Sequence, residues 1–133
     1  MEYAVRVGNP LTTLLTPVVD DNVGIVHHVT TLEQKQVLID DDSKILIVKL
    51  GAEWCGPCKN IMPGYKQMAL DYKDVVFSSE DVDDDIGNHP VEVKSIPAFH
   101  FYKNGSYVFQ VVGANLEKVE SQIIMLQLQE ENK

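Results

Sequence analysis

The chain has 133 residues, of which 44% are hydrophobic and 23% charged, which fits one compact domain and excludes two domains of ordinary size. Eleven Lys and Arg against 20 Asp and Glu give a formal charge of −9 at pH 7. Such a surface repels phosphate backbones and anionic lipid headgroups, and no apolar run approaches the roughly 20 residues of a membrane span. We therefore expect neither a nucleic acid nor a membrane as partner.

The N-terminus and the cysteine count favour a reducing compartment. Met1-Glu2-Tyr3 does not begin the basic and apolar regions of a secretory signal. The two cysteines, Cys55 and Cys58, exclude a framework of structural disulfides, because a bridge between them closes too short a loop to constrain the unfolded chain much. The sequence thus predicts a cytoplasmic protein in which a Cys55–Cys58 bond serves chemistry.

The hydrophobic pattern divides the chain into three parts. Residues 1–22 show no clear period and are punctuated by glycine, proline and a polar turn, which predicts an N-terminal extension. Periodic apolar segments follow, so we expect one domain over residues 23–128 and a polar tail over residues 129–133 that frays into solvent.

The domain is predicted to begin with a strand, a helix and a second strand. Residues 23–29 favour a short strand, and a helix is expected from Leu32 to Ile39, where a run of aspartates follows. Residues 45–50 are apolar in both alternating sets, as in a strand buried on two faces. Two overlapping capping boxes stand at the helix start: Thr30 with Glu33, and Thr31 with Gln34.

A second helix and a polar strand are predicted next. Apolar residues recur every three or four positions after Cys58 and stop near residues 73–74, which predicts a helix with a kink at Pro63. Residues 75–82 favour a strand. Its Ser78-Ser79-Glu80 run is unusually polar, so we expect that strand to be wet or exposed.

The last third of the domain is predicted to be a hairpin and a helix. Asn104-Gly105 lies between expected strands at 99–102 and 107–112, and it is a strong signal for a tight turn because both residues tolerate positive φ. From Asn115 apolar residues return at helical spacing. The order of elements predicts an α/β fold, with a central mixed sheet and helices on both faces.

One motif carries chemistry: Trp54-Cys55-Gly56-Pro57-Cys58-Lys59, where the buried strand gives way to a helix. Unpaired backbone N–H groups and the helix dipole favour an anion at that junction, so Cys55 is expected to be the attacking thiolate. Cys58 lies one turn further on, better shielded, and can reach a mixed disulfide formed by Cys55. Pro57 presets the helical φ and lacks a donor that would be left unpaired.

Two metal sites are the alternatives that the residue types allow. The spacing of Cys55 and Cys58 also occurs in zinc sites, but the four histidines lack the paired spacing that would supply two more ligands. A calcium loop fails because Ile86 replaces its required glycine, although four acidic residues fit the template: Asp81, Asp83, Asp85 and Glu92. We therefore expect a redox pair without a metal or bound cofactor.

Four further segments follow the cysteine motif: Asp81-Val82-Asp83-Asp84, Ile96-Pro97-Ala98-Phe99, Phe101-Tyr102-Lys103-Asn104-Gly105 and Gly113-Ala114-Asn115. In their order and separations these segments and the motif resemble the thioredoxin family. The resemblance covers most of the chain. It implies the thioredoxin fold and a redox-active disulfide that an external reductase reduces back to the dithiol.

The resemblance also implies site residues. Pro97 is expected to follow a cis peptide bond, to lie against the cysteines and to present the backbone of Ile96 to a bound peptide. Substrate proteins are expected to dock in extended form on a flat apolar surface made of Trp54, Gly56, Pro57, Ile96, Pro97, Gly113 and Ala114.

The chain departs from the family at Lys49, where thioredoxins carry a buried aspartate six residues before the first cysteine. Strand alternation places Lys49 with Ile45 and Ile47, so we expect it to be partly buried within reach of both thiols. One interpretation is a lysine that snorkels to water or pairs with a carboxylate. The other is a cation that favours both thiolates. The candidate carboxylates are Glu53, Glu80 and Asp81.

These observations predict a thioredoxin-type protein-disulfide reductase that works by dithiol–disulfide exchange at Cys55 and Cys58. Its expected partners are proteins with disulfides and an electron donor of the thioredoxin reductase type, and it is expected to act as a monomer in electron transport and cell redox homeostasis. The alternative is a binding module or complex subunit that uses the same apolar surface with weak or incidental redox activity. An oxidase or isomerase needs an oxidising compartment, for which the N-terminus offers no signal.

Overall fold

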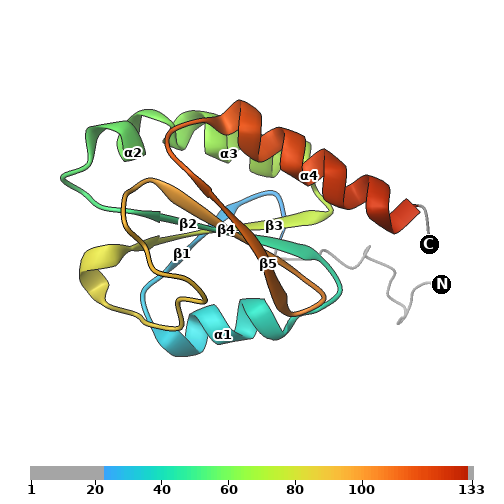
Figure 1. Ribbon diagram of the computed structural model, residues 1–133, viewed down its shortest axis with the longest axis horizontal. Helices are drawn as coiled ribbons and strands as arrows, with labels where there is room; N and C mark the ends of the chain where they lie inside the picture. The colour runs from blue at the N-terminus through green and yellow to red at the C-terminus, as the bar shows by residue number, and fades with distance from the viewer. Residues whose placement is uncertain (1–22, 132–133) are drawn as a thin grey trace, which may run out of the picture.

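The computed structural model describes residues 23–131 of the chain (Figure 1). The predicted extension over residues 1–22 lies outside the described residues, and the domain boundaries stay a prediction. The described elements are β1 (Val26–Val29), α1 (Leu32–Asp40), β2 (Ile45–Gly51), α2 (Gly56–Asn60), α3 (Met62–Asp71), β3 (Val75–Asp81), the 3-10 helix η2 (Val82–Asp84), β4 (Ala98–Lys103), β5 (Ser106–Val112) and α4 (Leu116–Glu131).

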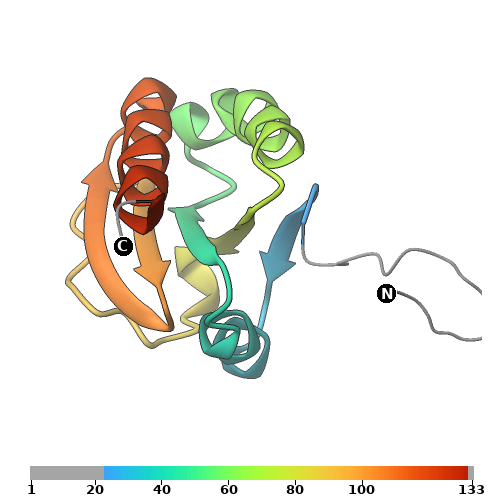
Figure 2. The same cartoon turned by 90° about the vertical axis from the view of Figure 1, so that its right-hand side faces the viewer.

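The strands form one five-stranded sheet in the order β1-β3-β2-β4-β5. β3 is parallel to β1 and β2, whereas β4 is antiparallel to β2 and β5. Figures 1 and 2 show α1 on one face of the sheet and α2, α3 and α4 on the other. The predicted architecture, a mixed sheet between helical layers, is confirmed.

Each face of the sheet has its own hydrophobic core. β2 is buried along its whole length, as its continuous apolar run predicts, because it contributes to both cores. The core under α3 and α4 is centred on Ile45, Ile47, Tyr65, Phe77, Phe99, Phe101 and Ile123. The core under α1 is centred on Leu38, Leu46, Val48, Leu50, Val76 and Ala98.

Local sequence signals fix a helix start and a turn as predicted. Of the two possible capping boxes, the one at Thr31 forms: its hydroxyl accepts the Gln34 N–H at 3.1 Å, and the Gln34 side chain accepts the Thr31 N–H at 3.3 Å. Asn104 and Gly105 adopt φ values of 56° and 78° between β4 and β5. The hairpin prediction is therefore confirmed.

Helix ends differ from the prediction in two places. The single helix expected with a kink at Pro63 is two helices, α2 and α3, which meet at Ile61. The break is expected where a proline, having no N–H, cannot continue the hydrogen-bond ladder. α4 continues to Glu131, so residues 129–131, predicted to fray, are helical.

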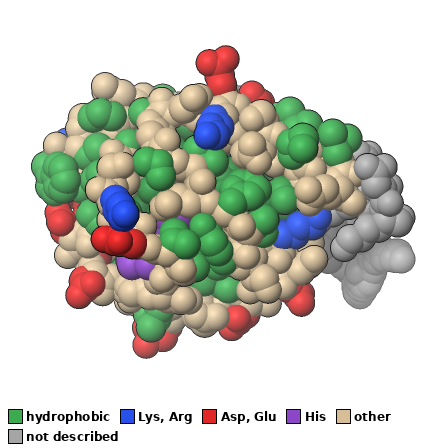
Figure 3. All heavy atoms as spheres, viewed as in Figure 1, with side chains coloured by type: hydrophobic (Ala, Val, Ile, Leu, Met, Phe, Trp, Pro, Cys, Tyr) green, Lys and Arg blue, Asp and Glu red, His purple; other side chains and the backbone are tan. Residues whose placement is uncertain are grey.

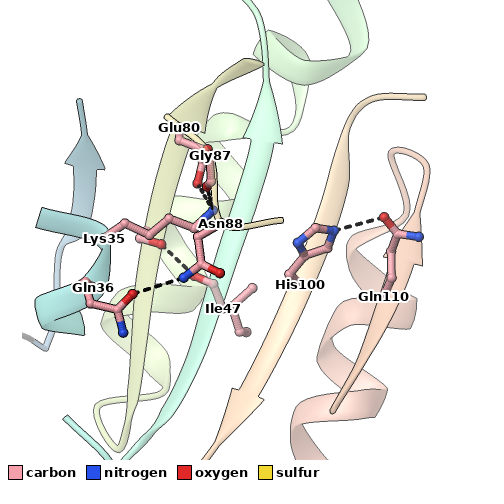
Figure 4. Close-up of polar contacts among 9 residues, drawn as sticks. Lys35, Gln36, Ile47, Glu80, Gly87, Asn88, His100 and Gln110 are labelled. Atoms are coloured by element: carbon pink, nitrogen blue, oxygen red, sulfur yellow. Dashed lines mark hydrogen bonds and ion pairs between the residues drawn. The ribbon is translucent and has the colours of Figure 1, made fainter. Parts of the chain in front are cut away.

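The polar run of β3 is buried, so the prediction of a wet or exposed strand is wrong. Ser78, Ser79 and Glu80 are 0%, 6% and 2% exposed. The Ser78 hydroxyl donates to the Ile47 carbonyl oxygen at 3.0 Å, and Glu80 forms a 2.9 Å ion pair with Lys35 of α1 (Figure 4). These partners come from other elements, which is why the pattern of β3 alone does not reveal its burial.

The surface agrees with the acidic composition. On the face drawn in Figure 3, acidic side chains lie mostly near the margin, and hydrophobic side chains form several separate groups. Among residues 23–131, no helix has the length and apolar character needed to cross a membrane.

Candidate active site

The cysteine motif lies at the end of the central strand β2. β2 ends at Gly51, and Cys55 is the N-cap of α2 in an extended conformation. The backbone N–H of Cys58 donates to the Cys55 sulfur at 3.2 Å. Pro57 lies in the first turn of α2, where a missing N–H leaves no donor unpaired. The predicted strand-to-helix junction is therefore present.

Cys55 and Cys58 form a disulfide bond. Cys55 is 6% exposed and Cys58 is 2% exposed, so Cys55 is the more accessible of the two. Ala52 belongs to the same small buried cluster, and the partly buried Val82 and Ile96 pack against it. The disulfide therefore sits in apolar surroundings, and Cys55 is the slightly more exposed of its two residues.

Trp54 stands beside the disulfide as an exposed aromatic residue. It is 70% exposed, and its indole N–H donates to the Asp83 carboxylate at 2.8 Å. This hydrogen bond ties the loop before α2 to η2, which follows β3. The indole ring is thus held in place although most of its surface faces water.

A second loop places the residue before the predicted proline against the cysteines. The Ile96–Pro97 peptide bond is cis, as the resemblance implies, and Ile96 packs against the disulfide cluster. The Gly113 N–H donates to the Pro97 carbonyl oxygen at 2.8 Å, with Gly113 at a φ of 105° that favours glycine. Ala114 follows and is exposed.

The residues predicted to dock substrate come from three segments: the cysteine motif, the cis-proline loop that packs against it through Ile96, and residues 113–114, which are hydrogen-bonded to that loop. Trp54 and Ile96 line one cavity of about 680 Å³ between η2 and the loop over residues 89–96. Gly56 and Pro57 are exposed on α2. Gly113 joins the group through its hydrogen bond to Pro97.

Lys49 is 4% exposed and lies near Cys58. A Cβ atom added to Gly51 would lie 3.0 Å from the Lys49 Nζ and 3.3 Å from the Cys58 Sγ, so both atoms border Gly51. Lys49 and Cys58 also line a cavity of about 580 Å³ that opens to solvent. Burial lowers the Lys49 pKa from its ordinary value of 10.5, and the charge of Asp81 opposes that shift.

Of the three candidate carboxylates, Asp81 is the one whose charge acts on Lys49. Strand alternation puts Asp81 on the face of Lys49 and Glu80 on the opposite face, so Glu80 as a partner for Lys49 is wrong. Glu80 pairs with Lys35 instead. Glu53 lines the cavity beside Lys49, but within residues 23–131 Lys49 forms no ion pair with a carboxylate.

The geometry defines a class of protein. Over residues 23–131, no group of three or more His, Cys, Asp or Glu side chains could hold a metal ion. A disulfide at a strand-to-helix junction, flanked by an exposed tryptophan and a cis-proline loop, can exchange with a disulfide in a bound polypeptide. The site is therefore that of a thiol–disulfide oxidoreductase.

Comparison with known sequences agrees with that class. The thioredoxin family model matches residues 26–125. Thioredoxin of Ophiophagus hannah is 45% identical over 93 residues, which cover 68% of this chain and 88% of that protein. Thioredoxin of Gallus gallus is 46% identical over 82 residues, 60% of this chain and 77% of the relative. The chain belongs to the thioredoxin family.

Solved structures extend the comparison to the fold. Thioredoxin f from spinach chloroplast superposes with a TM-score of 0.74 at 26% identity, over 80% of this chain and 90% of that one. Thioredoxin from Plasmodium falciparum superposes with a TM-score of 0.66 at 35% identity, over 75% of this chain and 98% of that one. One chain in the structure of a complex of ferredoxin:thioredoxin reductase with thioredoxin f2 superposes with a TM-score of 0.69 at 26% identity, over 80% of this chain and 98% of that one.

Site and comparisons together settle the activity. The protein is a thioredoxin-type protein-disulfide reductase that works through a redox-active Cys55–Cys58 disulfide and needs no bound cofactor. These findings favour the reductase over a binding module with incidental redox activity.

Sequence reasoning missed two residues that shape the site. Gly51 leaves the space that Lys49 and Cys58 border, and nothing in its strand marks this role. Asp83 holds the indole of Trp54. In the sequence Asp83 belongs to a segment that resembles the family and also fits a calcium template. Neither observation predicts its contact with Trp54, because the contact joins two loops that are far apart in the chain.

Proposed function

We propose that Cys55 attacks the disulfide of a bound protein and that Cys58 resolves the mixed disulfide. The Cys55 thiolate forms a bond to one substrate sulfur and releases the other as a thiolate. Cys58 then attacks Cys55, the Cys55–Cys58 bond forms, and the second substrate sulfur leaves. Two electrons pass from the dithiol to the substrate. The position of Cys55 carries this assignment: it caps α2, accepts the Cys58 N–H and is nearer to solvent.

Substrate proteins dock over the surface made of Trp54, Gly56, Pro57, Ile96, Pro97, Gly113 and Ala114. Two observations support this proposal: Trp54 is largely exposed although its N–H is held, and Ile96 packs against the disulfide cluster. A peptide that lies along Ile96 comes within reach of Cys55 in the extended form that backbone pairing favours.

An external reductase restores the dithiol. A similar solved structure is a complex of thioredoxin f2 with ferredoxin:thioredoxin reductase, which supports a donor of this general kind. The two cysteines of the chain both belong to the redox pair, as suits a reducing compartment such as the cytoplasm. There the protein acts as a monomer in electron transport and cell redox homeostasis.

Brief alkylation of the reduced full-length chain tests the two cysteine roles. Iodoacetamide is expected to modify Cys55 first, because Cys55 is the more accessible and better activated thiol, and peptide mass mapping identifies the labelled position. A Cys58→Ser variant should keep that labelling while it loses insulin reduction with a dithiol donor. Faster labelling of Cys58 would reverse the two roles.

A further inference from the structure

A row of polar side chains crosses the sheet toward the disulfide. Strand register places His28 of β1 opposite Ser79 of β3, and Ser79 opposite Lys49 of β2. The His28 Nδ1 and the Ser79 Oγ are 3.4 Å apart. His28 is exposed on an edge strand, whereas Lys49 is buried beside Cys58. The row therefore leads from the sheet edge to one of the two redox sulfurs.

The 580 Å³ cavity follows this row. The three residues of the row, His28, Ser79 and Lys49, all line the cavity. Cys58 lines it as well, whereas Cys55 does not. The cavity opens to solvent and has charged and polar side chains among its lining residues, so it admits water, and a proton released at Cys58 has a path to solvent. The other charged or titratable residues on its walls are Glu53, Lys59, Lys66, Glu80 and Asp81.

Lys49 is close enough to Cys58 to act on its charge. The Nζ and Sγ atoms are no farther apart than the sum of their distances to the Cβ position of Gly51. That upper limit is near the range of about 4–6 Å within which an opposite charge shifts the pKa of a neighbour substantially. Residue 51 is a glycine, so it places no side chain of its own against either atom.

We propose that the ammonium group of Lys49 stabilises the thiolate of Cys58 while Cys58 resolves the mixed disulfide. The inference rests on the proposed roles of the two cysteines. In this step the Cys58 thiol gives its proton to water in the cavity, and its sulfur attacks the Cys55 sulfur. The Cys55–substrate bond breaks, and the substrate sulfur leaves with the electron pair. Lys49 is a positioning residue, since it makes and breaks no covalent bond.

The oxidised protein leaves Lys49 without an anion of its own. Lys49 forms no ion pair within residues 23–131, and Asp81 acts on it only through its charge. Reduction frees Cys58 as a thiol, and its thiolate, once the proton has left, supplies the missing counterion. Lys49 therefore stabilises the reduced form, and a more stable reduced form makes the pair a weaker reductant.

The sharpest test isolates each thiol in the full-length chain. A Cys55→Ser background leaves Cys58 as the sole thiol, and a Cys58→Ser background leaves Cys55. In each background Lys49 is kept, or changed to Met, Gln or Arg. Thiolate absorbance in the ultraviolet is then followed against pH. Lys66→Met is the matched control, since it removes the same charge from the wall of the same cavity.

We expect both neutral variants to raise the Cys58 pKa by roughly one unit, and Lys49→Arg to restore most of the shift. Cys55 and the Lys66→Met control should move less. Two neutral variants are used so that poor folding of one does not decide the result. An unchanged Cys58 pKa in Lys49→Met and Lys49→Gln, or an equal shift at Cys55, would overturn the inference.

The redox potential gives a second readout in the chain with both cysteines. Wild type and Lys49→Met should have equal potentials at acid pH, where Cys58 is protonated in both. As the pH rises through the Cys58 pKa, Lys49→Met should become the stronger reductant, by up to tenfold in the exchange constant, which is about 30 mV. Potentials that differ by the same amount at every pH would contradict a thiolate effect.

Failure of the proposed function is separable from failure of this inference. If insulin is not reduced but the Cys58 pKa depends on Lys49, the cysteine roles are wrong and the electrostatic contact stands. If insulin is reduced through Cys55 and the Cys58 pKa ignores Lys49, the inference alone fails.

Discussion

Two buried lysines lie on opposite faces of the same sheet and have opposite surroundings. Lys35 of α1 is 1% exposed, forms a 2.9 Å ion pair with Glu80 and donates to the Gly87 carbonyl oxygen at 2.9 Å (Figure 4). Lys49 of β2 is 4% exposed, forms no ion pair within residues 23–131 and faces a cavity beside Cys58. Among the described residues, one cation therefore has an ion-pair partner, and the other has none while the disulfide is intact.

The difference separates a structural lysine from a functional one. A buried charge with a partner adds little net stability, but each partner becomes indispensable to the other. A buried charge without a partner lowers stability, and such violations of good packing are expected at functional sites. Lys35 and Glu80 therefore hold α1 and the loop at Gly87 to the sheet, whereas Lys49 serves the redox site.

The largest effect is expected when the matched lysine loses its partner. Glu80→Gln keeps the shape of the side chain and leaves Lys35 buried without a counterion, which should lower the free energy of unfolding by roughly 3–5 kcal/mol. The bond from Lys35 to the Gly87 carbonyl remains, so the lower end is expected. Urea unfolding of the oxidised chain at neutral pH measures the loss. Glu92→Gln, the same charge change at an exposed position, should stay within about 0.5 kcal/mol.

The double variant Lys35→Met/Glu80→Leu sharpens the comparison. It removes both charges and should return the free energy of unfolding to the wild-type value or above it, because well-packed apolar residues often replace a buried pair without loss. A double variant as unstable as Glu80→Gln would show that the pair contributes more than mutual neutralisation.

A smaller effect of opposite sign is expected at the unmatched lysine. Lys49→Met should stabilise the oxidised protein, because the folded state no longer holds a buried cation for which the charge of Asp81 compensates only in part. Burial lowers the Lys49 pKa of the folded protein below the 10.5 expected for the unfolded chain. At pH values between the folded-state pKa and 10.5, the unfolded chain therefore binds more protons than the folded one. Wild-type stability therefore gains with rising pH in that window. The advantage of Lys49→Met should be full at neutral pH and shrink as the pH approaches 10.5.

The measurement is the difference in unfolding free energy between the two proteins, taken at several pH values with the disulfide intact. The difference is used because buried tyrosines with raised pKa values, such as Tyr65 and Tyr102, titrate in both proteins, so their contributions to the pH dependence cancel. A Lys49→Met variant that is less stable at neutral pH would mean that Lys49 is matched after all.

Sequence alone could predict the fold because its local signals agree with one another. The Thr31 capping box, the two-faced apolar run of β2 and the Asn104-Gly105 turn each act over a few residues, and each is present. The cysteine motif and the Ile96-Pro97 pair are contiguous as well. The position of the site could therefore be predicted from the resemblance of these two motifs to those of a known family.

The partners of the buried lysines could not be predicted in the same way. Lys35 lies on α1, most of whose residues are not buried. The burial of Lys35 depends on its ion pair with Glu80, which is distant in the chain. The sequence does not distinguish Glu80 from Asp81 as a partner for Lys49, because only the strand register shows that they lie on opposite faces of β3. Tertiary contacts, rather than propensity, decide which charge meets which.

The smallest expected effect is at Gly51, which both Lys49 and Cys58 border. A methyl group there would lie 3.0 Å from the Lys49 Nζ and 3.2 Å from the Cys58 Cβ, closer than ordinary contact. The flexible end of Lys49 can yield toward the cavity, so Gly51→Ala should move the cation away from the sulfur. In the Cys55→Ser background the Cys58 pKa should rise by less than in Lys49→Met. Repeating Gly51→Ala in a Lys49→Met chain completes the cycle. There the methyl group should leave the Cys58 pKa unchanged, and an equal shift with and without Lys49 would show that it acts on the thiol directly.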